Sequence, residues 1–584
     1  MSLEQARAEL AIMSQAMAER WPVGRNVIDA SLLKDDRVAT ARSPLRLLLI
    51  AVALVLLLAC VNVANLTLVR ATSRTHEFAI RSALGSGGVR IARLLLVESM
   101  ILAVLGGLLG LALAGLAVEV LKVLGHDAIP RLDEVGFAPV ILGFAVLVTL
   151  ATAIAFGIAP AIRFARIDPK RALGQQSRSA TSARGPTRLR GGLAAAQLAL
   201  ALTLLAGAGV LMASFHRLRE LDLGFRADRV LTFDLTLPSA RYDTTRRVIF
   251  QQELARGLWT IPGATAAGGI TYLPATGSYN PWFTVNNTGP LAGDTMSSGR
   301  GTPNLQHRLV VGDYFAALEI PLLAGRAFEA QDDTSDPARA VVSAHFAERA
   351  FPGMPFEDVV GQRITVPAAG GDRDIIGVVG DVPLDARGSP ALIVYHANSN
   401  LVYPRTRLAY VVAAELPPER ILPAVREEVA ALDPELVVYN AALMSEIVGQ
   451  GVSSERFVLV LMGAFAVVAL TLAALGLYGV LAYTVRSRTQ EIGIRIALGA
   501  STGHVRTLVL RQAAVVVGIG LVAGTGGALA LGRSLSSLVF ETSPSDPRII
   551  AAMALLLAIT ALLSAWLPVR RASQVGPLIA MQES

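Results

Sequence analysis

Three patterns in this 584-residue sequence have residue types that could carry catalysis, and each fails for a physical reason. Residues 499–503 fit G-x-S-x-G, the pattern of a nucleophilic serine, but they stand in a short loop between apolar segments, and the related segment 85–88 has no matching serine. His345 and Glu348 lack the second histidine of a zinc protease motif. No lysine follows a glycine, so the Gly-Lys of a phosphate-binding Walker A motif is missing. We expect no catalytic, cofactor or metal site, and therefore no enzyme.

Two charged pairs remain, and their chemistry is that of recognition. Glu77 precedes Arg81 by four residues, and Glu491 precedes Arg495 in the same way. On a helix this spacing places acid and base one turn apart in the favourable order, beside an apolar stripe, and a glycine then ends each helix. We expect two short helices under the membrane that dock onto a cytoplasmic partner. Their predicted contact residues are Glu77, Ile80, Arg81, Leu84, Glu491, Ile494, Arg495 and Leu498.

The same two segments allow other interpretations. An amphipathic helix can lie among lipid headgroups and only anchor its loop. In the second segment apolar residues also alternate from Ile492 to Leu498, which is the pattern of a strand. Because the acid, the base and the glycine all return together, we favour docking onto a partner.

These helices belong to a longer internal repeat. Residues 74–85 match 488–499, and residues 160–169 match 568–577. Each copy of the first motif stands between hydrophobic segments. The chain therefore contains two copies of one membrane module.

The composition is that of an integral membrane protein, with 53% hydrophobic and 17% charged residues. Seven nearly uncharged segments are long enough to cross a bilayer, which takes about 20 residues. They are 47–69, 94–118, 138–162, 191–215, 457–485, 513–532 and 549–569. We expect a polytopic α-helical membrane protein of about seven transmembrane helices with one large mixed α/β extracytoplasmic domain.

Basic residues orient the spans, because short cytoplasmic loops retain Lys and Arg. Arginines are dense after the first and fifth spans and between the third and fourth. The opposite short loops, 123–137 and 534–547, contain Arg131 as their only Lys or Arg. We expect these loops and the segment 216–455 to face outward. The net charge of +7 then follows from topology, and we expect no nucleic-acid partner.

The order of the segments gives a domain plan. We expect a remnant of a first extracytoplasmic domain at 1–43, a first three-span module at 44–173, a cytoplasmic linker at 174–190, a span at 191–215, the extracytoplasmic domain at 216–455, and a second three-span module at 456–584. The first copy lacks the span and the domain that precede the second. We therefore expect the natural protein or its ancestor to have carried both ahead of Met1.

The extracytoplasmic segment mixes two periodicities. Alternation typical of strands occurs at 230–237, 309–311, 375–379 and 410–413. Helical patterns occur at 243–258, 338–350 and 418–432. This mixture predicts the α/β domain.

Small residues recur every fourth position in two spans. They are Gly106 and Gly110 in the first copy and Gly520 and Gly524 in the second, and such spacing allows close contact between helices. Asn62 shares one face of the first span with Asn65. We favour a packing role for both asparagines over a substrate site.

The whole pattern resembles a known family. A span, the segment R-x-x-E-[IF]-[AG]-I-R-x-A-L-G, two further spans and a closing segment ending in proline resemble the FtsX-like permease module of ABC transporters, as in the MacB-type exporters and the lipoprotein-releasing permeases. Residues 314–326 resemble the MacB-type extracytoplasmic domain. The duplication without an ATPase looks like the large duplicated permeases of Acidobacteria, here truncated at the N-terminus.

The resemblance implies a function. Residues 77–84 and 491–498 would be coupling helices that contact a separate ABC ATPase on the cytoplasmic side of a bacterial inner membrane. ATP-driven movement would pass through the spans to the periplasmic domain, which expels material already outside. Membrane lipid and a periplasmic protein are the other implied partners. Two alternatives stay open: a non-transporting FtsX-type protein that regulates the envelope, and an inactive truncated product.

Overall fold

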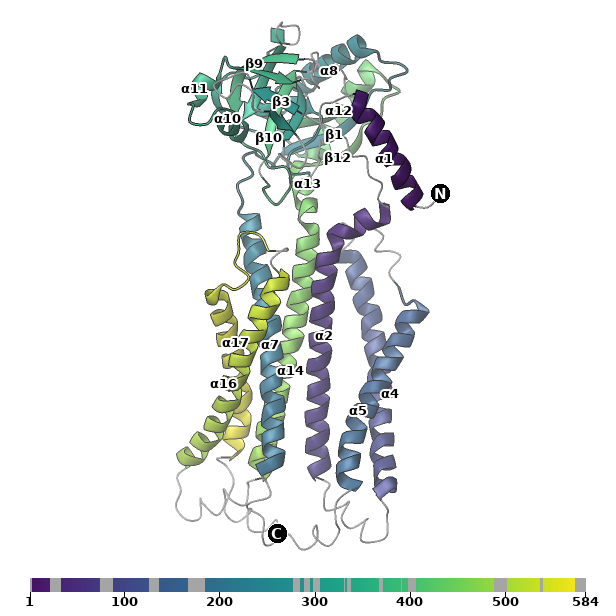
Figure 1. Ribbon diagram of the computed structural model, residues 1–584, viewed down its shortest axis with the longest axis vertical. Helices are drawn as coiled ribbons and strands as arrows, with labels where there is room; N and C mark the ends of the chain where they lie inside the picture. Colours follow the sequence, from purple (N-terminus) through teal and green to yellow (C-terminus); the bar gives the residue numbers. More distant parts are fainter. Residues whose placement is uncertain are drawn as a thin grey trace. The chain divides into compact units, whose positions relative to one another are not determined.

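The computed structural model describes most of the chain in two compact units. Unit 1 comprises Met1–Arg217 with Arg456–Ser584, and unit 2 comprises Leu218–Glu455. The described residues are 3–20, 33–73, 88–124, 136–165, 184–276, 284–287, 295–297, 305–329, 331–332, 338–366, 371–389, 391–397, 406–487, 502–535 and 539–572. Figure 1 shows their helices and strands and labels many of them.

Unit 1 is built from long helices. They are α1 (Leu3–Arg20), α2 (Leu33–Ser73), α4 (Gly88–Leu124), α5 (Pro139–Ala165), α7 (Arg184–Arg219), α14 (Ser453–Ser487), α16 (Thr502–Leu535) and α17 (Pro547–Ala572). The last two residues of α7 and the first three of α14 fall within unit 2.

Six helices among the described residues are long and apolar enough to span a membrane. The spans are Pro44–Asn65, Leu96–Lys122, Arg190–Arg219, Ser453–Val485, Leu510–Leu535 and Pro547–Arg570. The predicted span at 138–162 falls in α5, which contributes the shorter apolar helix Pro139–Ile154.

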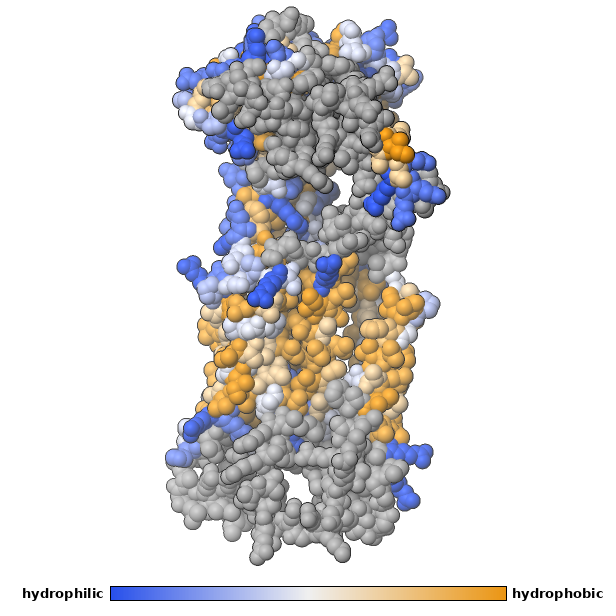
Figure 2. Space-filling model, viewed as in Figure 1, coloured by the Kyte–Doolittle hydropathy of each residue, from blue (hydrophilic) through white to orange (hydrophobic). Residues whose placement is uncertain are grey.

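Apolar side chains gather over the middle of these helices on the face seen in Figure 2. Exposed apolar side chains of these helices include Leu109 on α4, which is 64% exposed, and Leu563 on α17, which is 68% exposed. An apolar surface this large is stable in lipid and costly in water. The predicted fold class, a helical membrane protein with one large α/β domain, is confirmed.

Within the described residues, the strands of unit 2 form one 12-stranded mixed sheet. They are β1 (Val230–Thr236), β2 (Ala264–Ile270), β3 (Thr284–Asn287), β4 (Thr295–Ser297), β5 (Leu305–Gly312), β6 (Leu322–Gly325), β7 (Ala338–Ser343), β8 (Arg363–Val366), β9 (Gly371–Val379), β10 (Leu392–Ala397), β11 (Arg407–Ala414) and β12 (Tyr439–Leu443). Their order is β12-β1-β11-β2-β5-β10-β7-β9-β8-β3-β4, and β6 pairs with β9.

Helices cover the sheet of unit 2. They are α8 (Thr244–Trp259), α9 (Tyr314–Ala317), α10 (Ala344–Ala350), α11 (Phe356–Val359), α12 (Pro418–Leu432) and α13 (Met444–Gly451). Strand alternation sorts the core into two clusters: Tyr410 and Val412 of β11 pack with α8 and α12, whereas Val411 packs with α9.

One predicted helix is wrong in its first half. Residues 338–343 form β7, which pairs in parallel with β9, and the helix begins only at Ala344. Ser343 marks the change, because its hydroxyl accepts a hydrogen bond from the backbone N–H of Phe346 and caps α10. The β-branched Val341 and Val342 suit the strand that precedes this cap.

Candidate functional site

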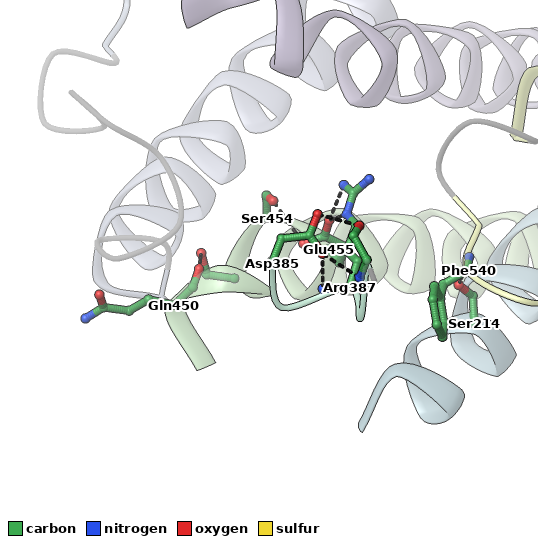
Figure 3. A network of polar contacts seen from close by, with 9 residues as sticks. Ser214, Asp385, Arg387, Gln450, Ser454, Glu455 and Phe540 are labelled. Carbon is green, nitrogen blue, oxygen red and sulfur yellow. Dashed lines mark hydrogen bonds and ion pairs between the residues drawn. The ribbon is translucent and has the colours of Figure 1, made fainter. Parts of the chain in front are cut away.

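A five-residue loop in unit 2, residues 385–389, contacts both ends of that unit. We call it the anchor loop. Gly388 packs against Leu221, two residues beyond the end of α7, and Arg387 pairs with Glu455 in the first turn of α14. Figure 3 shows the loop beside the start of α14. One short segment therefore contacts both the residues that follow α7 and the first turn of α14.

The carboxylate of Asp385 shapes the anchor loop from inside. Its Oδ1 accepts hydrogen bonds from the backbone N–H groups of Arg387, at 3.0 Å, and of Ser389, at 3.1 Å. Its Oδ2 accepts a third, from the Ser389 hydroxyl at 2.8 Å. A side chain that bonds its own backbone two residues on stabilises a tight turn. The turn aims Arg387 at Glu455.

The pair of Arg387 with Glu455 is doubly hydrogen-bonded. Nε of Arg387 donates to Oε1 of Glu455 at 2.9 Å, and Nη2 donates to the same oxygen. Oε2 of Glu455 accepts from the hydroxyl of Ser454 at 3.0 Å. The glutamate side chain is 17% exposed and the arginine 48%. A charge-assisted bond to a mostly buried carboxylate holds Glu455 against the anchor loop.

Glycine is required where the loop meets its neighbours. Gly388 has φ +77°, and a Cβ atom there would lie 2.4 Å from Cδ2 of Leu221. Gly451, the last residue of α13, approaches Ala386 so closely that its Cβ would lie 2.6 Å from the alanine Cβ. The anchor loop is thus packed on two sides without room for a methyl group.

In unit 1, the end of α7 is tied to the segment between α16 and α17. The backbone N–H of Phe540 donates to the hydroxyl of Ser214 at 2.8 Å, and Arg217 donates to the carbonyl of Glu541. Figure 3 shows the first of these pairs. These bonds hold three helices of the second repeat together at one end.

The spans of the second repeat pack on glycine. A Cβ on Gly520 would lie 2.6 Å from Cβ of Leu198, and one on Gly524 would lie 2.8 Å from Cβ of Leu202. Thr203 bridges the same contact, because its hydroxyl lies 3.4 Å from the carbonyl of Gly524. Helices α7 and α16 therefore meet almost backbone to backbone.

The matching glycines of the first repeat have another environment. Gly106 and Gly110 are exposed on α4, and among the described residues no atom would lie within 4 Å of a Cβ built on either. The neighbouring Gly107 faces α5 instead, and a Cβ built on it would lie 3.2 Å from Cγ2 of Thr149.

The two repeats meet through buried amides inside the membrane unit. Nδ2 of Asn62 donates to the carbonyl of Leu472 at 2.9 Å, and Nδ2 of Asn65 donates to that of Gly476 at 3.4 Å. Gln197 of α7 is fully buried against the same Gly476. Three amides from two helices thus surround one turn of α14.

The clefts in the described part of unit 2 include the following two. One, of about 410 Å³, is polar: Asp234 accepts hydrogen bonds from Arg407 at 2.7 Å and from Asn440 at 2.8 Å. The other, of about 490 Å³, is lined by residues that include Trp259 and Phe328. No group of three or more metal-ligating side chains occurs in the described part of the chain.

The matches to known protein families agree with the division of the chain into two repeats and one sheet domain. Residues 49–169 and 463–577 both match the FtsX-like permease C-terminal domain, and residues 237–432 match the MacB-like periplasmic core domain. The chain belongs to the FtsX-like permeases. The two permease matches lie in the two sequence repeats, and the periplasmic match lies in unit 2.

Curated relatives of this FtsX-like permease are exporters by name. The macrolide export ATP-binding/permease protein MacB of Rhodospirillum rubrum is 28% identical over 286 residues, which cover 46% of this chain and 41% of that protein. The pyoverdine export ATP-binding/permease protein PvdT of Pseudomonas aeruginosa is 27% identical over 297 residues, covering 48% and 43%. Each match spans less than half of the relative's length.

A solved structure is similar to part of this chain. The periplasmic region of MacB from Actinobacillus actinomycetemcomitans aligns with 40% of this chain and 95% of its own, at 14% identity and a TM-score of 0.26. With its apolar helices and its MacB-like domain, this FtsX-like permease is a multi-pass inner-membrane protein with a large periplasmic domain. The predicted localisation is confirmed.

The predicted coupling residues of this FtsX-like permease lie outside the described residues. They are Glu77, Ile80, Arg81, Leu84, Glu491, Ile494, Arg495 and Leu498. Their docking role stays a prediction.

Sequence reasoning missed the anchor loop and Gln197. The run of Asp385 to Ser389 does carry a turn signal, because Asp, Gly and Ser favour turns. Gln197 is a glutamine within an apolar span, and a polar side chain at that depth is itself a signal.

Proposed function

We propose that this chain is the permease subunit of an ABC-type exporter that transmits movement, driven by an ATPase on a separate polypeptide, from the cytoplasm to its periplasmic domain. The export relatives and the two permease domains support the transporter class. The 584 residues contain no Gly-Lys pair of a Walker A motif.

The anchor loop is the observation that carries the proposal. Leu221 lies two residues beyond α7, and Glu455 lies in the first turn of α14, so a shift of either helix along its axis acts on residues 385–389. Hydrogen bonds inside the loop resist its deformation. Movement at a helix end is therefore passed to the sheet domain as a displacement of the loop.

The buried amides connect the spans that would transmit the movement. Gln197 packs on Gly476, and the same glycine carbonyl accepts from Asn65. A movement of α14 would therefore act on both α2 and α7. Polar contacts of this kind are common between transmembrane helices, and each contributes about 0.6 kcal/mol on average.

Charge reversal at the coupling segments tests the proposal. The variant Glu77→Arg with Glu491→Arg is expected to release the ATPase that co-purifies with the tagged wild-type chain from its own membranes. The control is Glu253→Arg with Glu427→Arg, two exposed glutamates of unit 2. No ATPase with the wild-type chain, or release by both variants, would contradict the proposal.

A second assay, which measures efflux and envelope remodelling in cells, distinguishes the exporter from the envelope-regulating alternative. If the chain belongs to an exporter, cells that carry the double variant should accumulate the exported material in the periplasm or the cytoplasm. A regulator predicts altered envelope remodelling with unchanged efflux.

A further inference from the structure

Arg308 is a charged side chain in the interior of unit 2. It lies on β5 and is 0% exposed. Its Nη1 donates to the carbonyl of Tyr272 at 3.1 Å, but its Nε and Nη2 are buried without a hydrogen-bond partner among the described residues. A guanidinium stays protonated in proteins, and a buried charge without a countercharge is strongly destabilising. The interior of unit 2 therefore contains a positive charge that a further group must balance.

Two buried hydroxyl groups lie on the same face of the sheet. Tyr395 of β10 is the register partner of Arg308 in the parallel pair of β5 and β10, and Tyr314 of α9 packs in the same core cluster as Tyr395. Both tyrosines are 0% exposed, and neither hydroxyl has a hydrogen-bond partner in the described part of the chain. Burial raises the pKa of both tyrosines, and the positive charge of Arg308 acts to lower it, so the guanidinium is within electrostatic reach of both hydroxyls.

Asp381 does not balance the charge of Arg308. This carboxylate does act on Tyr395, whose pKa it helps to raise. However, Asp381 is an exposed residue, and its Oδ1 accepts a hydrogen bond from the backbone N–H of His345 at 2.8 Å. Within the described ranges, no ion pair joins Arg308 to Asp381 or to another carboxylate.

We propose that Arg308, Tyr314 and Tyr395 bind a small inorganic anion of the size of chloride. Nε and Nη2 of the arginine supply N–H donors and the positive charge, and each tyrosine hydroxyl can turn its proton toward the anion. A buried water would accept the same hydrogen bonds but would leave the charge unbalanced. This inference does not depend on the proposed function.

Enclosure limits the size of the ligand. All three side chains are fully buried, and neither the polar cleft nor the cleft beside Trp259 is lined by any of them. A site of this kind excludes organic anions and suits a monatomic one. An anion that binds only the folded state stabilises that state, and the stabilisation grows with its concentration.

The chloride dependence of unfolding tests the proposal with the full chain in detergent. Unfolding temperatures are measured in sodium chloride and in sodium gluconate at equal ionic strength, because gluconate is too large for an enclosed site. We expect the wild-type chain to unfold about 2–4 °C higher in chloride. Arg308→Met, which keeps a long side chain without the charge, should unfold at the same temperature in both salts.

The tyrosines provide a matched pair of variants that keep the aromatic ring. Tyr395→Phe should raise about tenfold the chloride concentration that gives half of the stabilisation, because one hydrogen bond to a charged group is lost. Tyr410→Phe is the control: its hydroxyl is also buried without a described partner, but Tyr410 packs in the core cluster on the other face of the sheet. It should leave that concentration unchanged.

Anomalous scattering from crystals of the full chain grown in sodium bromide locates the anion. A bromide peak beside the guanidinium of Arg308 is the expected result. Equal unfolding temperatures of the wild-type chain in the two salts, a wild-type chloride response in Arg308→Met, or no bromide peak at Arg308 would each overturn the proposal. If Arg308→Met does not fold, equal effects of Tyr395→Phe and Tyr410→Phe would overturn it.

Discussion

Gly476 lies directly against the amide of Gln197: a Cβ atom built on this glycine would stand 2.1 Å from Oε1 of Gln197. In the first repeat the equivalent position is Asn62, whose own amide donates to α14. At this position of the repeat, α2 therefore carries an amide side chain, whereas α14 carries a glycine against which other amides pack.

Replacing this glycine tests the contact. We expect Gly476→Ala to lower the stability of the solubilised chain by about 1–3 kcal/mol, because a methyl group forces a packed side chain to move. Gly463→Ala on the same helix is the control, since no described atom would lie within 4 Å of its Cβ. Thermal unfolding in detergent compares the two. Equal unfolding temperatures would show that Gln197 moves aside freely.

The pair of Arg387 with Glu455 has a close match elsewhere in unit 2. Arg363 with Asp374 has side-chain exposures of 49% and 18%, against 48% and 17% for the anchor-loop pair. Partly exposed pairs contribute about 0–1 kcal/mol, so Arg387→Ala and Arg363→Ala should cost similar stability.

Their effects on transmission should differ. With the ATPase bound, Arg387→Ala is expected to abolish or strongly reduce the ATP-dependent change in deuterium uptake of unit 2, and Arg363→Ala is expected to preserve it. A normal response in Arg387→Ala would remove the anchor loop from the path.

A comparison of Gly388, in the anchor loop, with Gly353 separates the stability cost of backbone strain from the cost of overpacking. Gly353 has φ +78° with no described atom within 4 Å of a built Cβ, whereas Gly388 has φ +77° and Leu221 at 2.4 Å. Gly353→Ala should cost about 1 kcal/mol from the left-handed backbone alone. Gly388→Ala should cost a further 1–3 kcal/mol, roughly, for overpacking. Unfolding temperatures of the two variants measure the difference, which vanishes if Leu221 yields.

Asp332 should make unit 2 sensitive to acid. Burial acts to raise its pKa, but hydrogen bonds from Arg326, at 2.6 and 2.8 Å, and from the backbone of Glu329 outweigh burial and hold the pKa below the ordinary 3.8. A folded-state pKa below the unfolded value gives stability that is present above pH 3.8 and is lost as the pH falls through the folded value.

We therefore expect the unfolding temperature of the wild-type chain to fall below about pH 4. Asp332→Asn should lose stability at neutral pH and show a shallower fall. The control is Asp358→Asn, an exposed carboxylate on α11. Parallel pH profiles for wild type and Asp332→Asn would contradict this assignment.

Periodicity and length predicted the membrane helices and most of unit 2, because both depend on local sequence. Residues 338–343 were misassigned, since pairing with β9 overrides a short ambiguous pattern. The unequal environments of Gly110 and Gly524 were beyond sequence reasoning. Their local sequences are alike, and the difference comes from a helix supplied by a distant part of the chain.

The anchor loop also bears on how this architecture can be assembled. Leu221 and Glu455, near the two ends of unit 2, both contact a five-residue loop, so the domain begins and ends at one place. A domain with adjacent termini can be inserted into a host or exchanged without opening the host's fold. Unit 2 can therefore be exchanged as a whole, and different periplasmic domains could be inserted between α7 and α14 at these two points.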